Sequence, residues 1–147
     1  MYKKDKFIIM HTNIQSSKNK LNSLVAILKT NDVNLVTINE THLRANDKLN
    51  IEGYKTFTRN RKDKAKGGIA TCVNNKSAAT SLKVGEGQDD EYIITRHGEF
   101  SPAINVINYY GKQESRQSKE NIEEDWEKIL HEIIRIEAKN EHFSAFR

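Results

Sequence analysis

The sequence contains very little cysteine, proline or tryptophan. Its 147 residues include one of each: Cys72, Pro102 and Trp126. A lone cysteine cannot form a disulfide within the chain, which excludes a small secreted scaffold held together by disulfides. Cys72 lies in the apolar run 69–73 and is expected to be a small buried side chain. This cysteine usage favours a reducing, intracellular setting.

Long hydrophobic runs are also absent. Lys3, Lys4 and Lys6 precede only four consecutive apolar residues, 7–10, before His11. That stretch is too short for a secretory signal or a membrane span, so we expect a nuclear or cytoplasmic protein with no membrane partner. The five histidines are too far apart for a helical ligand pair, and no Cys–His metal motif occurs.

Length and charge indicate the number of domains and the kind of binding partner. With 147 residues, 36% of them hydrophobic, the chain fits one compact domain spanning 1–147. A net charge of +4, from 24 Lys and Arg against 20 Asp and Glu, leans mildly toward a polyanionic partner.

The first 40 residues predict an α/β crossover. An apolar strand over 7–12 ends on Asn13, and a second over 33–39 ends on Glu40. Between them lies a helix that Ser16 or Ser17 is expected to cap and that ends at 31–32, with one apolar face made by Leu21, Leu24, Val25 and Leu28. A strand, a helix and a strand of this length predict two parallel strands whose carboxyl ends share one rim of the sheet.

The rest of the chain changes character. Five short β-like runs are expected to form an antiparallel meander: 54–58, 68–73, 78–84, 91–95 and 104–110. A long amphipathic helix over about 119–140 follows, with one apolar face made by Ile122, Trp126, Ile129, Ile133 and Ile136.

The strand ends carry the candidate chemistry. A carboxylate at Glu40 and an amide at Asn13, both at one rim, suit phosphate chemistry with Mg²⁺. From the spacing alone, Glu40 is either a metal ligand or a solvated acid, and Asn13 is either a functional amide or a turn former. Tyr110 follows the run 104–109 and could hydrogen-bond a phosphoryl oxygen, although one of two adjacent tyrosines usually packs inward.

A basic loop over 59–66 precedes Gly67 and Gly68. It either contacts a nucleic-acid backbone or is an ordinary solvated loop. Its candidate nucleic-acid-binding residues are Arg59, Arg61, Lys62 and Lys64.

These segments together resemble the endonuclease/exonuclease/phosphatase superfamily, in the AP-endonuclease-like form found in non-LTR retrotransposons. The residues that carry the resemblance are 11–16, 33–43, 53–54, 59–61, 67–70 and 107–111, in the family's order and spacing. One departure is Asn39, where the family commonly has glutamine. Another is Lys112, where a proline often stands.

The resemblance implies an α/β fold, a four-layered sandwich of two mixed sheets flanked by helices. It implies phosphodiester cleavage of DNA with Mg²⁺, or Mn²⁺ in its place, beside a reverse transcriptase domain in the intact parent protein. By the resemblance, Asn13, Glu40 and Tyr110 are the catalytic residues, and Glu40 and Asn13 hold the metal.

The family's Gly-Asp-x-Asn and Ser-Asp-His motifs do not occur in this sequence. We therefore expect an incomplete sandwich: a truncated, N-terminal portion of such an endonuclease, with little or no activity alone and a tendency to aggregate. Two alternatives stay open. One is a nucleic-acid-binding or interaction module without catalysis, and the other is a phosphatase-like member of the same superfamily.

Overall fold

The computed structural model describes residues 6–17, 20–60, 67–85, 91–110, 123, 127–132 and 134–135. The chain divides into two compact units, residues 1–110 and residues 111–147. The helix and strands named below all belong to the first unit. The single truncated domain over 1–147 stays a prediction.

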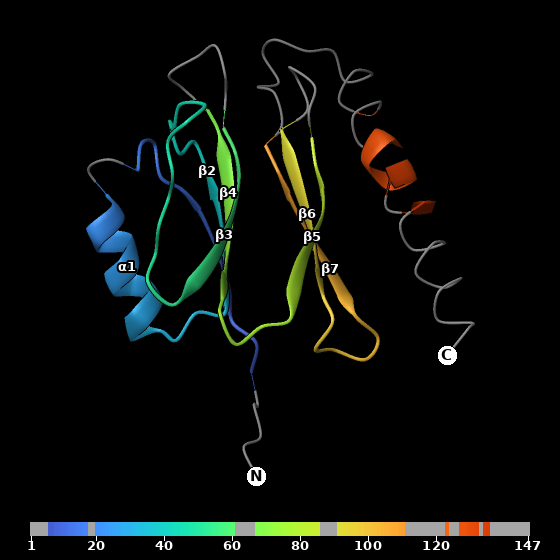
Figure 1. Cartoon of the computed structure of the whole chain (residues 1–147), viewed down its shortest axis with the longest axis horizontal. Helices are drawn as coiled ribbons and strands as arrows, with labels where there is room; N and C mark the ends of the chain where they lie inside the picture. Colours follow the sequence, from blue (N-terminus) through green and yellow to red (C-terminus); the bar gives the residue numbers. More distant parts are fainter. Residues whose placement is uncertain are drawn as a thin grey trace. The chain divides into compact units, whose positions relative to one another are not determined.

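The first sheet contains both strands that end on the candidate residues. Its order is β1 (Ile9–Asn13), β2 (Leu35–Asn39), β4 (Ile69–Asn74) and β3 (Tyr54–Arg59). β1 and β2 are parallel, whereas β4 runs antiparallel to both β2 and β3. Helix α1 (Leu21–Thr30) connects the two parallel strands and lies against one face of the sheet (Figure 1). The crossover predicted from the sequence is therefore confirmed.

The buried side chains of β2 alternate between two apolar layers. Val36 and Ile38 join a core that includes Leu24 and Leu28 of α1, whereas Leu35 joins a second cluster with Val106 packed against it. Every residue of β2 is buried, because α1 covers one face and the second sheet the other. This explains why the sequence of β2 is apolar without a clean alternation.

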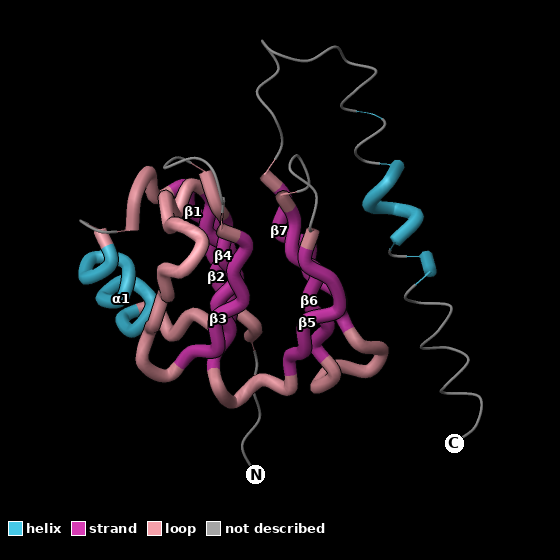
Figure 2. Tube along the Cα trace, turned by 45° about the horizontal axis from the view of Figure 1, so that its top comes forward, coloured by secondary structure: helices cyan, strands magenta, loops and turns pink. Residues whose placement is uncertain are grey.

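The second sheet is an antiparallel meander of β5 (Ala79–Val84), β6 (Tyr92–His97) and β7 (Ile104–Tyr109). Figure 2 shows it beside the first sheet, on the side away from α1. The prediction of one five-strand meander was wrong: β3 and β4 belong to the first sheet, and only β5, β6 and β7 form the meander. β4 pairs with β2 instead of β5, because its residues Ala70 and Cys72 complete the core under α1.

The start of α1 also differs from the prediction. Lys20 occupies the N-cap position, and no side chain caps the helix. The Ser17 hydroxyl instead donates to the carbonyl oxygen of Thr41, at 3.1 Å. Ser17 therefore joins the segment before α1 to the segment after β2. The predicted capping role of Ser17 was wrong, because this tertiary hydrogen bond uses its hydroxyl. The helix ends at Asn31, as predicted.

The second unit is helical where it is described. Residues 123, 127–132 and 134–135 are in helical conformation, within the helix predicted over about 119–140. Of the residues predicted for its apolar face, all but Ile129 lie outside the described part. No helix within the described residues is long and apolar enough to cross a membrane.

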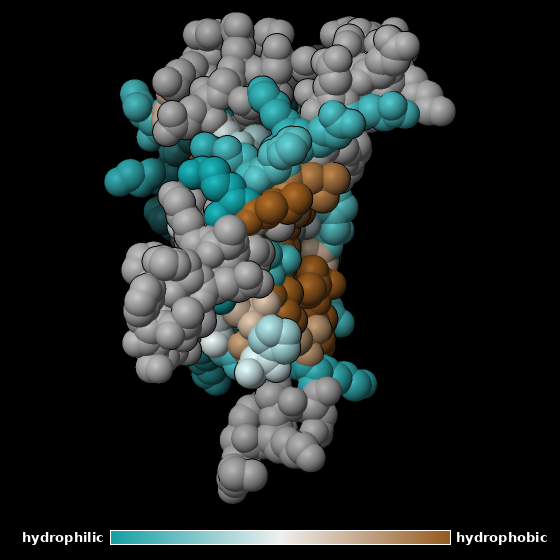
Figure 3. Space-filling model, turned by 90° about the vertical axis from the view of Figure 1, so that its right-hand side faces the viewer, coloured by the Kyte–Doolittle hydropathy of each residue, from teal (hydrophilic) through white to brown (hydrophobic). Residues whose placement is uncertain are grey.

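Some large apolar side chains remain at the surface. Ile9 of β1 is 54% exposed and Ile104 of β7 is 43% exposed, and Ile27, Leu130 and Ile134 are exposed as well. Figure 3 shows exposed hydrophobic residues, coloured brown, beside hydrophilic ones on one face of the molecule. Among the described strands, β1 and β7 each have one neighbour, so both are edge strands.

Candidate functional site

Parallel pairing brings the ends of β1 and β2 together. Asn13 lies opposite Asn39 in the register, and the amide of Ile14 donates to the carbonyl oxygen of Asn39 at 3.0 Å. Glu40 follows Asn39 directly. The structure thus places Asn13 and Glu40 at one rim of the sheet, as the sequence predicts; this edge is called the strand-end rim below.

The chain stays paired beyond the two strands, through unusual backbone. The amide of Ser16 donates to the carbonyl oxygen of Glu40 at 2.9 Å, and that of Ser17 to Thr41 at 3.0 Å. Glu40 and His42 both have φ of 56°, in the left-handed region that residues other than glycine rarely adopt. Such strained backbone persists only where its surroundings hold it, and it is concentrated at functional sites.

A glycine turn holds the other side of this segment. The carbonyl oxygens of Gly68 and Gly67 accept the amides of Thr41 and His42, at 3.1 Å and 2.8 Å. Gly68 has φ of +84°, and a Cβ there would lie 2.6 Å from the Thr41 hydroxyl oxygen. Only glycine fits this position, because both its conformation and the close approach of Thr41 exclude a side chain.

Two further bonds connect this turn to Tyr110. The amide of Gly68 donates to Oε1 of Glu91 at 3.3 Å, and the carbonyl oxygen of Glu91 accepts the amide of Tyr110 at 3.0 Å. Nearby, the Asn108 side chain donates to the carbonyl oxygen of Ala70 at 2.8 Å, joining β7 to β4. Tyr110, which follows β7 of the second sheet, therefore lies at the same rim as Asn13 and Glu40.

Several polar atoms at the rim lack partners. Glu40 is half-buried, and its carboxylate receives no hydrogen bond from the described part of the chain. Oδ1 of Asn39, a residue only 9% exposed, and Nε2 of His42 are buried without a partner among the described residues. Buried polar atoms are nearly always hydrogen-bonded, so these atoms are candidates for contact with water, an ion or a ligand.

These atoms offer a limited set of metal ligands. Among the described residues, no group of three or more His, Cys, Asp or Glu side chains is arranged to hold a metal ion. Mg²⁺ nevertheless uses only one or two carboxylates and keeps several of its waters. The Glu40 carboxylate supplies one such ligand, and Asn13 and Asn39 bring two side-chain amides to the same rim.

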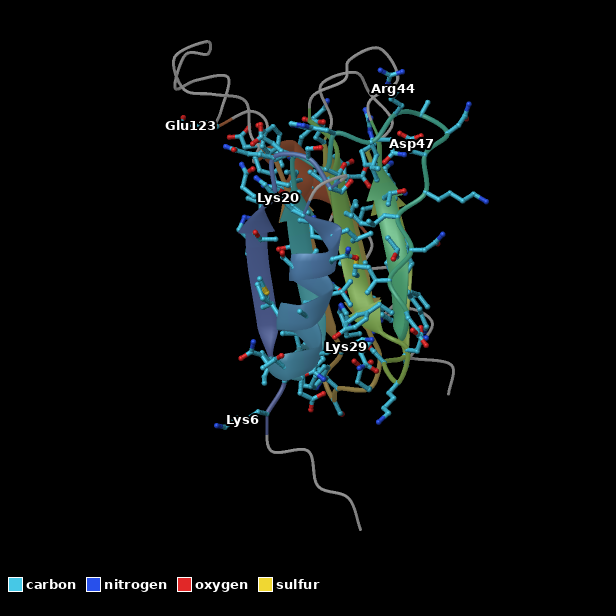
Figure 4. All side chains as sticks on the ribbon, turned by 90° about the vertical axis from the view of Figure 1, so that its left-hand side faces the viewer. Lys6, Lys20, Lys29, Arg44, Asp47 and Glu123 are labelled. Carbon is cyan, nitrogen blue, oxygen red and sulfur yellow. The ribbon has the colours of Figure 1, made fainter. Side chains whose placement is uncertain are left out.

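The basic residues divide into three groups. Arg59 donates from Nε to the carbonyl oxygen of Gly85 at 2.6 Å and from Nη1 to that of Asn60 at 2.8 Å, so it joins the ends of β3 and β5. Arg61, Lys62 and Lys64 lie outside the described residues. Figure 4 shows Lys20 and Arg44 at the end of the molecule toward which β1 and β2 point, and Lys6 and Lys29 at the opposite end.

A surface pocket of about 570 Å³ lies elsewhere, between the segment 47–52 and β3. Tyr54, Thr56 and Thr58 line it from the strand. None of Asn13, Glu40 and Tyr110 lines this pocket, so it is separate from the strand-end rim.

A second polar cluster lies at the far end of β6 and consists of Ser77, Thr95, His97 and Glu99. His97 is fully buried, with Nε2 at 3.0 Å from the Thr95 hydroxyl and Nδ1 at 3.5 Å from that of Ser77. Burial lowers the pKa of His97, and the nearby Glu99 carboxylate only partly opposes this effect.

Glu99 is held by the same cluster. Its two carboxylate oxygens accept the Ser77 hydroxyl at 2.6 Å and the Ala78 amide at 3.0 Å. Partial burial raises the pKa of Glu99, but the hydrogen bonds from Ser77 and the backbone outweigh it and leave that pKa below its ordinary value. This cluster, called the far cluster below, therefore has its polar groups paired.

Three features of the rim were not predicted from the sequence: the unpartnered Oδ1 of Asn39, the contacts of Gly67 and Gly68 with the segment after Glu40, and the burial of Glu91. In the sequence, Asn39 is the last residue of the second predicted strand and a departure from the family pattern. The acid that opens the apolar strand 91–95 was a detectable signal for Glu91, because a carboxylate at the start of a buried strand needs a partner.

Comparison with solved structures identifies the fold. The chain matches an AP endonuclease from Leishmania major over 71% of its own length and 39% of that chain, with a TM-score of 0.55 and 20% identity. It matches the endonuclease domain of TRAS1, a telomere-specific non-LTR retrotransposon, over 90% of its length and 54% of that chain, with a TM-score of 0.59 and 16% identity. The chain has an AP-endonuclease-like fold.

An AP endonuclease from Archaeoglobus fulgidus has the same fold. That match covers 71% of this chain and 41% of the other, with a TM-score of 0.51 and 18% identity. No protein-family model matches the chain. The chain thus spans between about two fifths and about half of the length of these AP-endonuclease-like structures. The predicted α/β class is confirmed, and the four-layer count stays a prediction.

Proposed function

We propose that this chain corresponds to the N-terminal portion of a Mg²⁺-dependent DNA endonuclease of the retroelement type. One observation carries the proposal: residues from three strand ends, Asn13, Glu40 and Tyr110, come to one rim, where the Glu40 carboxylate has no partner in the described part of the chain. The AP-endonuclease-like fold supports a nuclease over an unrelated phosphate-binding protein. A reverse transcriptase partner and a nuclear or cytoplasmic location belong to the same proposal.

The residues at the strand-end rim have different roles in the proposed cleavage. Glu40, with Asn13, would hold the Mg²⁺, and the buried, unpartnered Oδ1 of Asn39 would be available as a hydrogen-bond acceptor at the same rim. When bound, Mg²⁺ neutralises the developing charge on the phosphodiester oxygens. Asn13 and Tyr110 orient the scissile phosphate. The basic residues Arg61, Lys62 and Lys64 contact the nucleic-acid backbone, together with Arg59, which also bonds the carbonyl oxygens of Gly85 and Asn60.

We further propose that the chain alone cleaves DNA slowly or not at all. Efficient hydrolysis requires a group that removes a proton from the attacking water, and the family's motifs that carry such groups do not occur in the sequence. Removing part of a catalytic constellation usually removes most of its rate contribution.

Metal binding is the direct test. Mn²⁺ binding to the full chain, followed by electron paramagnetic resonance, should weaken more than about 10-fold in Glu40→Gln, because the amide replaces the carboxylate ligand. Glu52→Gln is the matched control, since Glu52 is an exposed acid in the segment 47–52 that lines the separate pocket. Equal affinities in the wild type and Glu40→Gln would remove the metal site from the proposal.

Activity assays then separate the alternatives. Mg²⁺-dependent nicking of supercoiled plasmid that disappears in Glu40→Gln would establish catalysis and contradict the low-activity part of the proposal. Salt-sensitive DNA binding without cleavage or Mn²⁺ binding would support a non-catalytic module. Hydrolysis of small phosphate esters without nicking would favour a phosphatase-like enzyme.

A further inference from the structure

Glu91 is a buried carboxylate at the start of β6. It is only 3% exposed, although a buried charge is costly unless it is hydrogen-bonded. Its backbone and its side chain bond to different segments: Oε1 accepts the Gly68 amide at 3.3 Å, and the carbonyl oxygen accepts the Tyr110 amide at 3.0 Å. One residue thus contacts the segments on both sides of the strand-end rim.

The bond to Gly68 continues toward Glu40. Gly68 and Gly67 in turn accept the amides of Thr41 and His42, which immediately follow Glu40. These glycines, at φ of +84° and +87°, form the only described backbone contact that holds that side of the left-handed segment at 40–42. The other side is held by the amides of Ser16 and Ser17.

We infer that Glu91 is a positioning residue that fixes the Glu40 carboxylate for metal binding, acting through the Gly67–Gly68 turn. This inference rests on the proposed function, because it requires a metal at Glu40. Glu91 itself does not contact the metal. Its carboxylate restrains the Gly68 amide. Because Gly68 in turn accepts the Thr41 amide, this restraint helps to keep Glu40 in its strained left-handed conformation.

The bond to the Gly68 amide requires, at position 91, a side chain of glutamate length that ends in an acceptor oxygen. Glu91→Gln keeps the side-chain length and an oxygen that can accept the Gly68 amide, but removes the negative charge. Glu91→Asp keeps the charge, but its side chain is one methylene shorter and moves the carboxylate out of hydrogen-bond distance of Gly68. A carboxylate acting directly on a metal or a proton would show the opposite ranking.

Mn²⁺ affinity of the full chain, measured by electron paramagnetic resonance, tests this ranking. We expect Glu91→Gln to stay within about twofold of the wild type and Glu91→Asp to bind about 10-fold more weakly, the usual size of an outer-shell effect. Amide hydrogen exchange at Gly68 should become faster in Glu91→Asp and change little in Glu91→Gln. Wild-type affinity in Glu91→Asp, or equal losses in both variants, would overturn the inference.

Glu99 provides the matched control. It flanks the other end of β6, and its carboxylate likewise accepts a backbone amide, that of Ala78 at 3.0 Å. Glu99→Asp should therefore loosen the far cluster without changing Mn²⁺ affinity. A loss of affinity in Glu99→Asp as large as that in Glu91→Asp would show general destabilisation and overturn the positioning role.

Glu40→Gln separates this inference from the proposed function. If Glu40→Gln leaves Mn²⁺ binding intact, the metal site itself is wrong. If Glu40→Gln removes binding while both Glu91 variants match the wild type, the proposed function survives and only the positioning role of Glu91 fails.

Discussion

Within the described part of the chain, some polar groups near one end of β6 lack hydrogen-bond partners, whereas those near the other end have them. At the strand-end rim, the Asn39 amide oxygen and the His42 ring nitrogen are buried without a partner among the described residues. At the far cluster, both ring nitrogens of His97 and both carboxylate oxygens of Glu99 have partners. Paired polar groups stabilise a fold, whereas unpaired ones at strained backbone are typical of a functional site.

The same contrast extends to the backbone. Four of the five residues other than glycine with positive φ, Gln15, Ser16, Glu40 and His42, lie in the segments that follow β1 and β2. None of the far-cluster residues has such a conformation. The rim therefore holds conformational strain that the far cluster lacks, and the following experiments test whether that strain depends on the glycine turn.

The largest expected effect comes from Gly68→Ala. The new Cβ would meet the Thr41 hydroxyl oxygen at 2.6 Å in a left-handed conformation. We expect the free energy of unfolding to fall by about 1–3 kcal/mol, measured by urea denaturation. Mn²⁺ affinity should fall as well, because the turn holds the segment after Glu40.

Gly53→Ala is the control for that substitution. Gly53 has a similar φ of +86°, but a Cβ there would meet nothing within 4 Å. Its cost should reflect the backbone conformation alone, with unchanged Mn²⁺ affinity. Equal effects of the two substitutions would show that the close approach to Thr41 contributes nothing.

Acidification should affect the far cluster next. Because burial puts the pKa of His97 below its ordinary 6.5, its contribution to stability is complete above pH 6.5 and is lost as the pH falls toward the folded-state pKa. The lowered pKa of Glu99 adds stability above pH 4.5 that is lost at lower pH. Urea denaturation between pH 7 and pH 4 should show a falling free energy of unfolding.

His97→Gln identifies the source of the first decrease. The glutamine does not titrate, so the decrease in stability just below pH 6.5 should shrink while the loss below pH 4.5 remains. An unchanged pH profile in His97→Gln would assign the decrease to other groups and weaken the contrast between the two ends.

The smallest expected effect concerns association through the edge strands. Ile9 of β1 and Ile104 of β7 expose large apolar side chains on strands that have one described neighbour each. We expect the chain to self-associate at rising concentration and Ile9→Lys or Ile104→Lys to reduce this, measured by light scattering. Ile27→Lys, at a similarly exposed site on α1, should have less effect. Monomeric behaviour with a cooperative thermal transition would contradict the predicted aggregation.

The local elements were largely predictable from the sequence. Leu24 and Leu28 recur at helical spacing, and they do form the buried face of α1. The expected parallel pairing of the first two strands is confirmed, which explains why Asn13 and Glu40 lie at one rim. The roles proposed for Asn13, Glu40, Tyr110 and the basic residues remain predictions.

Other features could not be predicted from local patterns. The sequence allows Ser17 to cap α1, but the folded chain offers its hydroxyl the Thr41 carbonyl, which lies 24 residues away. Likewise, β4 has turn residues before β5 that suit a hairpin, yet it pairs with β2. In both cases a contact between distant segments overrode the local preference: a hydrogen bond for Ser17, and burial in the core under α1 for β4.

Among the described elements of the first unit, the sequence alone therefore determined which segments become helix or strand and which polar residues end them. The reason is that hydrophobic periodicity is set by residues that are neighbours in the chain. Only the tertiary structure decided that Glu91 reaches Gly68, that Tyr110 joins the rim and that Asn39 keeps an unpaired oxygen. Those outcomes depend on how two sheets pack face to face. The pairing of groups that are far apart in the chain follows from the whole fold, and no short stretch of sequence encodes it.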